Sequence, residues 1–183
     1  MSTIHEGRAK QSLATPAAGG SATRVATIAA AAIRLSIGWV FLWAFLDKAF
    51  GLGHETPSKD AWINGGSPTA GFLGFATAGP FSGAYHQIAG QTWADWLFML
   101  GLLGIGSALM LGVAMRIATA AGVLLLVLMW TAVLPPANNL FMDDHLIYAM
   151  TLVLITALGA GHTLGLGSRW DRLPMVRSRP WLR

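Results

Sequence analysis

The sequence predicts an all-α integral membrane protein, a bundle of four transmembrane helices with short interfacial helices in its first outer loop. Of its 183 residues, 54% are hydrophobic and only 11% are charged, whereas soluble domains carry about 25% charged residues. The apolar residues gather into four runs of membrane-spanning length. The chain has no cysteine, which excludes a disulfide scaffold, thiolate metal sites and covalently attached c-type haem.

The four apolar runs predict the spans in chain order. Each run holds about 18–22 residues, and at 1.5 Å per residue that length is suited to a hydrocarbon core of about 30 Å. Arg34 interrupts the first run, and Asp95 lies near the start of the second. We expect one membrane domain over 24–167. Its spans are expected at about 25–48, 93–114, 117–134 and 145–164.

The segments outside the spans are unequal in length. Residues 1–23 are rich in Ala, Gly, Ser and Thr without apolar periodicity, which predicts a disordered tail. In the outer loop 51–92, Ser67-Pro68 is typical of a helix start. Two short helices are expected after it, over Thr69–Ala78 and Phe81–Ala89, and their aromatic residues favour a place at the membrane interface.

The charges predict the orientation. With the N-terminus in the cytoplasm, ten basic and two acidic residues lie on the cytoplasmic side, against two basic and six acidic residues outside. Because Lys and Arg are retained in the cytoplasm, we expect a multi-pass protein of the plasma membrane with both termini cytoplasmic. Residues 168–183 then form a basic cytoplasmic tail. The net charge of +4 reflects this orientation and not a nucleic-acid partner.

The first span carries ionisable residues that need a partner or a role, because a charge inside a membrane is costly. Arg34 either snorkels to the cytoplasmic interface or binds a ligand. Lys48 either anchors the boundary or pairs with an outer carboxylate, and Asp47 and Trp43 share a stripe of the same helix. Trp43, with Trp130 on the third span, could wall a flat ligand such as a quinone, with core packing as the alternative.

The start of the fourth span is the densest group of chemistry-bearing residues. Asp143, Asp144 and His145 precede the apolar run, and Tyr148 lies one turn beyond. Imidazole and carboxylate together can bind a carbonyl and exchange protons near neutral pH, so we assign Asp144, His145 and Tyr148 as candidate catalytic residues. The alternative for the two aspartates is helix capping. No haem or metal is expected, since His145 and His162 lie at opposite ends of one helix.

The stretch that begins at Arg34, places Gly38 four residues on and ends at Lys48 resembles the opening helix of the DoxX/DoxD family. The resemblance covers most of residues 30–167 and implies a four-helix bundle with a redox link. DoxD-like proteins are described as the membrane subunit of a thiosulfate:quinone oxidoreductase that works with a smaller partner subunit. Three further stretches are similar to the DoxD branch: 71–73, 96–104 and 139–145.

Two hypotheses of function follow, and whether the chain is itself an enzyme stays open. In the first, it is a quinone-interacting redox subunit that acts on a sulfur donor, with quinone as the diffusible electron acceptor. Lys48 would then stabilise an anionic substrate or quinol, and His145 with Asp144 would handle protons. In the second, it is a non-catalytic anchor or assembly component of a redox complex. A transporter is less favoured, because paired broken repeats are absent from the sequence.

The expected partners are membrane lipid and a second redox subunit. Small residues recur four apart on the second span, at Gly104, Ala108 and Gly112, and also on the fourth. Such ladders let helix backbones approach closely in lipid. We expect them to serve packing inside the bundle, with a homo-oligomer as the alternative.

Overall fold

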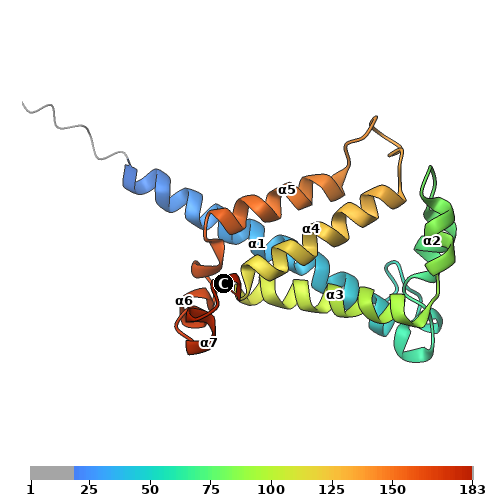
Figure 1. Cartoon of the computed structure of the whole chain (residues 1–183), viewed down its shortest axis with the longest axis horizontal. Coiled ribbons are helices and arrows are strands. Elements are labelled where there is room, and N and C mark those ends of the chain that lie inside the picture. Colours follow the sequence, from blue (N-terminus) through green and yellow to red (C-terminus); the bar gives the residue numbers. More distant parts are fainter. Residues whose placement is uncertain (1–18, 183) are drawn as a thin grey trace, which may run out of the picture.

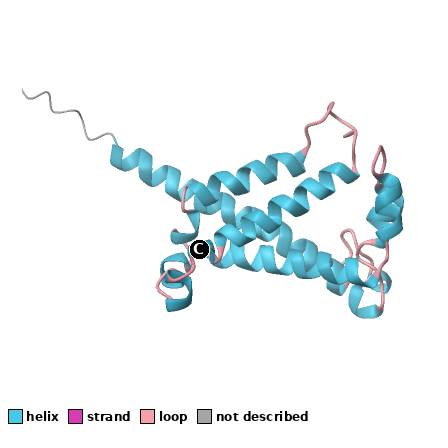
Figure 2. Ribbon diagram, in the orientation of Figure 1, coloured by secondary structure: helices cyan, strands magenta, loops and turns pink. Residues whose placement is uncertain are grey.

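The computed structural model describes residues 19–182, which form helices and loops without a strand (Figures 1 and 2). Three of the helices, α1, α3 and α4, are long and apolar enough to cross a membrane. The prediction of an all-helical membrane protein is confirmed to that extent. The four principal helices are α1 (Gly19–Phe50), α3 (Thr92–Leu111), α4 (Met115–Ala132) and α5 (Asp144–Ala157).

The fourth predicted span is shorter than expected. α5 has 14 residues, about 21 Å of helix, which is less than the hydrocarbon core of about 30 Å. The expected end near residue 164 is wrong because the chain turns at Gly159, which has a φ of +67°, a value that glycine adopts without strain. The 3-10 turn η4 (Ala160–His162) follows. A fourth crossing stays a prediction.

The helices pack as two pairs, α1 with α3 and α4 with α5, joined mainly by contacts between α3 and α4. We call the end where α1 stops and α5 starts the loop end. The end where α4 starts and α5 stops is the tail end. The two pairs diverge toward the loop end, where α2 (Ser82–Ile88) lies across the opening between α3 and α4 (Figure 1).

The contact between α1 and α3 is a close backbone approach. A Cβ on Gly106 of α3 would lie 2.7 Å from the backbone nitrogen of Leu42, and a Cβ on Gly38 of α1 would lie 3.0 Å from the backbone nitrogen of Met110. Both glycines are buried. Small residues are thus what lets these two helices meet. The apolar core continues from this contact through Phe41 to the other helix pair.

The loop 51–92 folds into short turns at the loop end. The two helices expected there are shorter than predicted: η3 covers Phe72–Ala76 and α2 covers Ser82–Ile88. Ser67 makes a capping contact, because its hydroxyl accepts the backbone N–H of Ala70 at 3.1 Å, but η3 itself begins later than predicted, at Phe72. The remaining turns of this loop are η1 (Ser58–Asp60) and η2 (Trp62–Asn64).

The two terminal segments differ from the predicted tails. Residues 19–23, expected within the disordered tail, are helical and begin α1, whereas residues 1–18 lie outside the described residues. The basic segment 168–183 is folded over its described part. It forms α6 (Gly167–Trp170), α7 (Pro174–Arg177) and η5 (Pro180–Leu182), and η5 contacts α4.

Candidate functional site

The last turn of α1 holds the start of the loop 51–92. Asp47 is only 3% exposed, and its carboxylate accepts the backbone N–H groups of His54 (3.2 Å), Glu55 (3.1 Å) and Thr56 (2.9 Å). Lys48 forms an ion pair with Glu55 at 3.2 Å. The loop is therefore folded back on the helix from which it emerges.

Trp43 connects this loop to the helix surface. Its ring meets the His54 ring edge-on, with centroids 5.1 Å apart, and lies 5.8 Å from the Trp39 ring. Trp43 is half-buried and Trp39 is exposed. Trp43, Asp47 and Lys48, which the sequence singled out together, thus share one neighbourhood at the loop end.

The start of α5 carries the second group. Asp143 caps the helix, because its Oδ1 accepts the backbone N–H of Leu146 at 3.2 Å, and its Oδ2 lies 2.7 Å from Nδ1 of His145. Oδ1 of Asp144 is farther from the same nitrogen, at 3.5 Å. The Asp143 and His145 side chains are 11% and 18% exposed, against 70% for Asp144. The imidazole therefore pairs chiefly with Asp143, whereas the sequence predicts Asp144, and not Asp143, as a candidate catalytic residue.

The same three residues are those that could hold a divalent metal ion. A ligand atom from each of Asp143, Asp144 and His145 lies within 4.8 Å of the others. They are consecutive in sequence, and the Asp143 oxygens already bind the helix start and the imidazole. Their proximity is thus accounted for by helix capping. Tyr148, one turn later, is half-buried and packs against the core.

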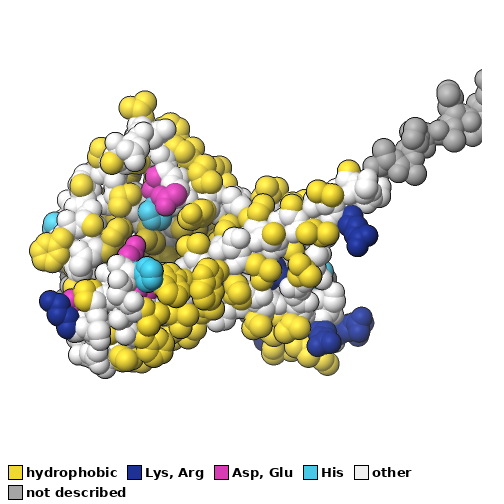
Figure 3. All heavy atoms as spheres, turned by 180° about the vertical axis from the view of Figure 1, so that it is seen from behind, with side chains coloured by type: hydrophobic (Ala, Val, Ile, Leu, Met, Phe, Trp, Pro, Cys, Tyr) yellow, Lys and Arg dark blue, Asp and Glu magenta, His cyan; other side chains and the backbone are white. Residues whose placement is uncertain are grey.

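The two groups lie at one end of the molecule but do not merge. Figure 3 shows acidic and histidine side chains in two neighbouring groups beside a hollow on this face. Within residues 19–182, Lys48 pairs with Glu55, and His145 pairs with the aspartates of its own helix start. The structure therefore does not join Lys48 to His145 or Asp144 through a hydrogen bond.

The other two predicted site residues lie elsewhere in the bundle. Trp130 donates its indole N–H to the carbonyl of Phe141 at 2.6 Å and so braces the connection between α4 and α5. Arg34 is at the tail end, and its side chain is completely buried. Snorkelling, one of the two alternatives for Arg34, is therefore wrong.

Arg34 is surrounded by backbone carbonyls. Two belong to the last turn of α3 and three to the segment after α5, so the guanidinium joins α1 to both. Residues near helix C-termini carry carbonyls that have no partner within the helix, and a guanidinium offers five N–H donors for them. Its acceptors are the carbonyl oxygens of Leu109, Met110 (3.0 Å), Ala160 (3.2 Å), Thr163 (3.2 Å) and Leu164 (2.9 Å).

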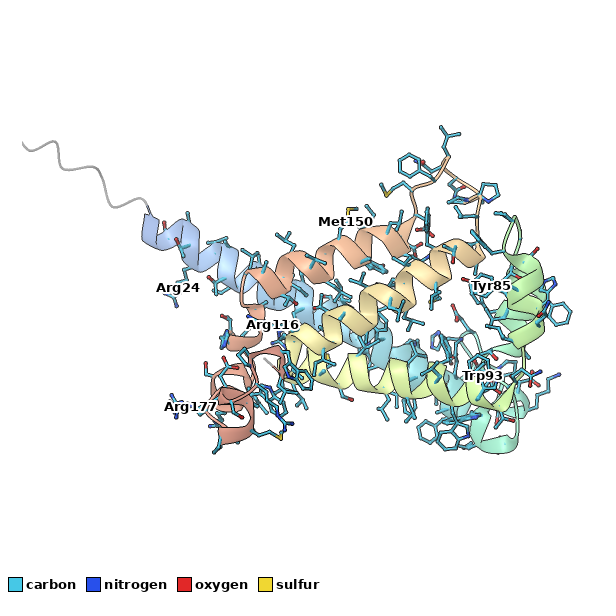
Figure 4. The ribbon with its side chains drawn as sticks, viewed as in Figure 1. Arg24, Tyr85, Trp93, Arg116, Met150 and Arg177 are labelled. Atoms are coloured by element: carbon cyan, nitrogen blue, oxygen red, sulfur yellow. The ribbon has the colours of Figure 1, made fainter. Side chains whose placement is uncertain are left out.

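A groove of about 400 Å³ lies between α2 and α4, and the sequence does not predict it. The hydroxyl of Tyr85 on α2 donates to the carbonyl of Leu128 at 2.9 Å and lies 2.5 Å from the hydroxyl of Thr131 on α4. Tyr85 faces α4 from its short helix (Figure 4). The rest of the wall is apolar, from Phe81, Ala84 and Ile88. Tyr85 is one of the aromatic residues of the loop 51–92 that the sequence predicts at the membrane interface, and nothing in the sequence pairs it with a threonine 46 residues away.

Comparison of this chain with protein-family models, with curated proteins and with solved structures finds no match. The resemblance to the DoxX/DoxD family thus stays a prediction, and the function is argued from the residues of the loop end.

Proposed function

We propose that this chain is a quinone-interacting membrane subunit of a redox system, as the resemblance to DoxX/DoxD proteins implies. The observation that carries the proposal is the groove between α2 and α4. Its volume of about 400 Å³ lies within the roughly 300–1,000 Å³ typical of small-molecule sites, which combine apolar walls with a few polar groups. The hydroxyls of Tyr85 and Thr131 are the polar groups here. Both reach the carbonyl of Leu128, at 2.9 and 2.8 Å, so one hydroxyl can keep that carbonyl paired while the other donates to a quinone carbonyl.

The pair of His145 and Asp143 supplies the second element of the proposal. Reduction of a quinone to a quinol consumes two protons with the two electrons, so such a subunit needs groups that deliver protons. An imidazole held by a carboxylate at 2.7 Å can do so as a general acid. The electrons come from a sulfur donor, and we propose that a second subunit passes them on.

Quinone reduction in isolated membranes tests this proposal. We expect thiosulfate-dependent quinone reduction by the wild type, and a clear loss in His145→Ala and in Tyr85→Phe at equal amounts of protein. His86→Ala is the matched control, since this exposed histidine lies on α2 next to Tyr85. Equal activity in the wild type and in both site variants would remove the proposed site.

A non-catalytic anchor is the second candidate function. The observation that favours it is the ion pair of Lys48 with Glu55. Lys48 is the cation expected to stabilise an anionic substrate or quinol, and in this ion pair it holds the loop 51–92 instead. In that case the wild type and the His145→Ala variant would carry the same partner through purification in mild detergent. Purification without any stable partner would count against the anchor.

The proposed subunit has four crossings and both termini in the cytoplasm, which is what the charge distribution supports. Because the chain has no cysteine, single cysteines can test this. Asn139→Cys and Ser178→Cys, both exposed positions, flank α5 on its two sides. In intact cells an impermeant maleimide should label the first and should label the second only after permeabilisation. Labelling of both from the same side would mean that α5 does not cross.

A further inference from the structure

The tail end contains a second cavity, of about 270 Å³, between the start of α4 and the segment that follows α5. Its lining includes Arg116 of α4, the pair of His162 and Asp171, and Trp170, together with Gly112 and Gly161. Neither the sequence motifs nor the proposed quinone site uses this cavity. Its lining brings together side chains from two parts of the chain that are far apart in sequence.

His162 and Asp171 are paired in the lining of the cavity. Nδ1 of His162 lies 3.1 Å from the carbonyl oxygen of Gly159, and its Nε2 lies 2.9 Å from Oδ2 of Asp171. Both ring nitrogens therefore already face acceptors within the protein. Asp171, the carboxylate in the lining, thus has His162 as its partner.

Arg116 provides a cation that forms no ion pair with a carboxylate of residues 19–182. Its Nη1 donates to the carbonyl oxygen of Pro180 at 2.9 Å, which uses one of the five N–H donors of the guanidinium. The side chain is exposed, so the remaining donors are open to an anion from solution or from the membrane surface.

The buried Arg34 adds positive charge behind the cavity wall. Gly112 lines the cavity, and a Cβ on Gly112 would lie 3.2 Å from Nη1 of Arg34. All five acceptors of Arg34 are backbone carbonyls, so no carboxylate among residues 19–182 neutralises it. A charge buried in a medium of low polarity acts over several ångströms with little screening. The cavity is therefore positive from two directions, Arg34 and Arg116.

We propose that this cavity binds a phosphate group, supplied either by an anionic phospholipid or by free phosphate. Arg116 would hold two phosphate oxygens through its planar fork, the arrangement that guanidinium groups favour. The bound group would lie between the first turn of α4 and α6, which is the part of the molecule where the basic tail folds back. Trp170, in the same lining, is a residue type common at the level of lipid headgroups.

Thermal unfolding of the purified full chain in detergent tests the proposal, because a ligand that binds the folded state raises the unfolding temperature. One arm adds phosphatidylglycerol against phosphatidylcholine. The other adds inorganic phosphate against chloride at the same ionic strength. A rise in the first arm alone assigns a lipid headgroup, and a rise in the second assigns free phosphate. No rise in either arm overturns the proposal.

Matched arginine variants separate this cavity from the general charge of the tail. Arg116→Gln should weaken binding about tenfold, as for a lost charge-assisted hydrogen bond, and Arg116→Lys should retain part of it. Arg177→Gln is the control, because Arg177 lies on the far side of α7 from Arg116 (Figure 4) and is not in the lining. Its effect should stay below about twofold. Equal losses in both glutamine variants would show diffuse attraction and overturn the site.

Discussion

The two ends of the bundle are fastened by ionisable residues of opposite charge. At the loop end, the buried Asp47 and Asp95 accept N–H and O–H groups of the loop 51–92. At the tail end, the buried Arg34 donates to carbonyls. The difference follows from what the backbone leaves unpaired: turns that enter a loop expose N–H groups, whereas helix ends expose carbonyls. A carboxylate suits the first and a guanidinium suits the second.

The hydrogen bonds of Asp47 and of Arg34 also differ in how far apart in sequence their partners lie. Asp47 binds residues seven to nine positions along the chain, so it fixes one loop to its own helix. Arg34 binds carbonyls 75 to 130 positions away and thus joins three separate parts of the bundle. We therefore expect damage at the tail end to be global and damage at the loop end to be local.

Arg34→Met should have the largest effect. The substitution fills a similar length but removes the guanidinium donor from five carbonyls, of which that of Leu109 keeps a backbone N–H. Each buried acceptor left without a donor costs about 1–3 kcal/mol. We expect a large fall in unfolding temperature and in the yield of monodisperse protein. Arg34→Lys should fall between Met and the wild type, because an ammonium has three donors. Unchanged unfolding of Arg34→Met would show that the bundle is held elsewhere.

Gly106→Ala tests the close contact between α1 and α3, which lies between the two ends of the bundle. Its Cβ would lie 2.7 Å from the backbone nitrogen of Leu42, so α1 and α3 must separate, at a cost of about 1–3 kcal/mol. Gly104→Ala is the matched control on the same helix, since a Cβ there meets nothing within 4 Å. The control should be neutral or slightly stabilising, because alanine favours helix. Thermal unfolding of both variants measures the difference, and equal values would contradict the close approach.

Asp47→Asn should loosen the loop end without unfolding the bundle. The amide offers one oxygen in place of two, so part of the three N–H bonds is lost, at about 1–3 kcal/mol. We expect faster amide hydrogen exchange at residues 54–56 and little change in α3 or α4. Asp60→Asn, at an exposed position, serves as the control. Faster exchange throughout the molecule would mean that the loop-end fastening is global after all.

The sequence was sufficient for features that depend on near neighbours. Apolar length placed α1, α3 and α4 to within a few residues, apart from the N-terminal extension of α1, and Ser67 and Asp143 have the capping contacts expected of them. The end of α5 was misplaced because hydrophobicity continues past Gly159, where the backbone turns. Composition does not register that change of dihedral angle.

Contacts between distant residues were beyond the sequence. The spacing of small residues predicts that Gly104 is a packing residue, but Gly106 makes the close contact between α1 and α3. A series of small residues four positions apart does not say which face of the helix meets a neighbour. The carbonyl partners of Arg34 have no side-chain signature at all, since any residue supplies a carbonyl. The pairing of Tyr85 with Thr131 depends on how the loop folds over α4.

Ser67→Ala should have the smallest effect and shows how far the loop end depends on a single contact. The Ser67 hydroxyl donates to Asp95 at 2.8 Å and caps the turn at Ala70, and loss of a cap costs about 1 kcal/mol. Asp95 keeps the hydroxyl and the backbone N–H of Thr69, at 2.6 and 3.0 Å, so the turn should persist. We expect faster exchange at Ala70 alone, with Ser168→Ala, an exposed serine of α6, showing no change there. If exchange also rises at Thr69, the serine and not the carboxylate organises this turn, and the parallel between Asp95 and Asp47 fails.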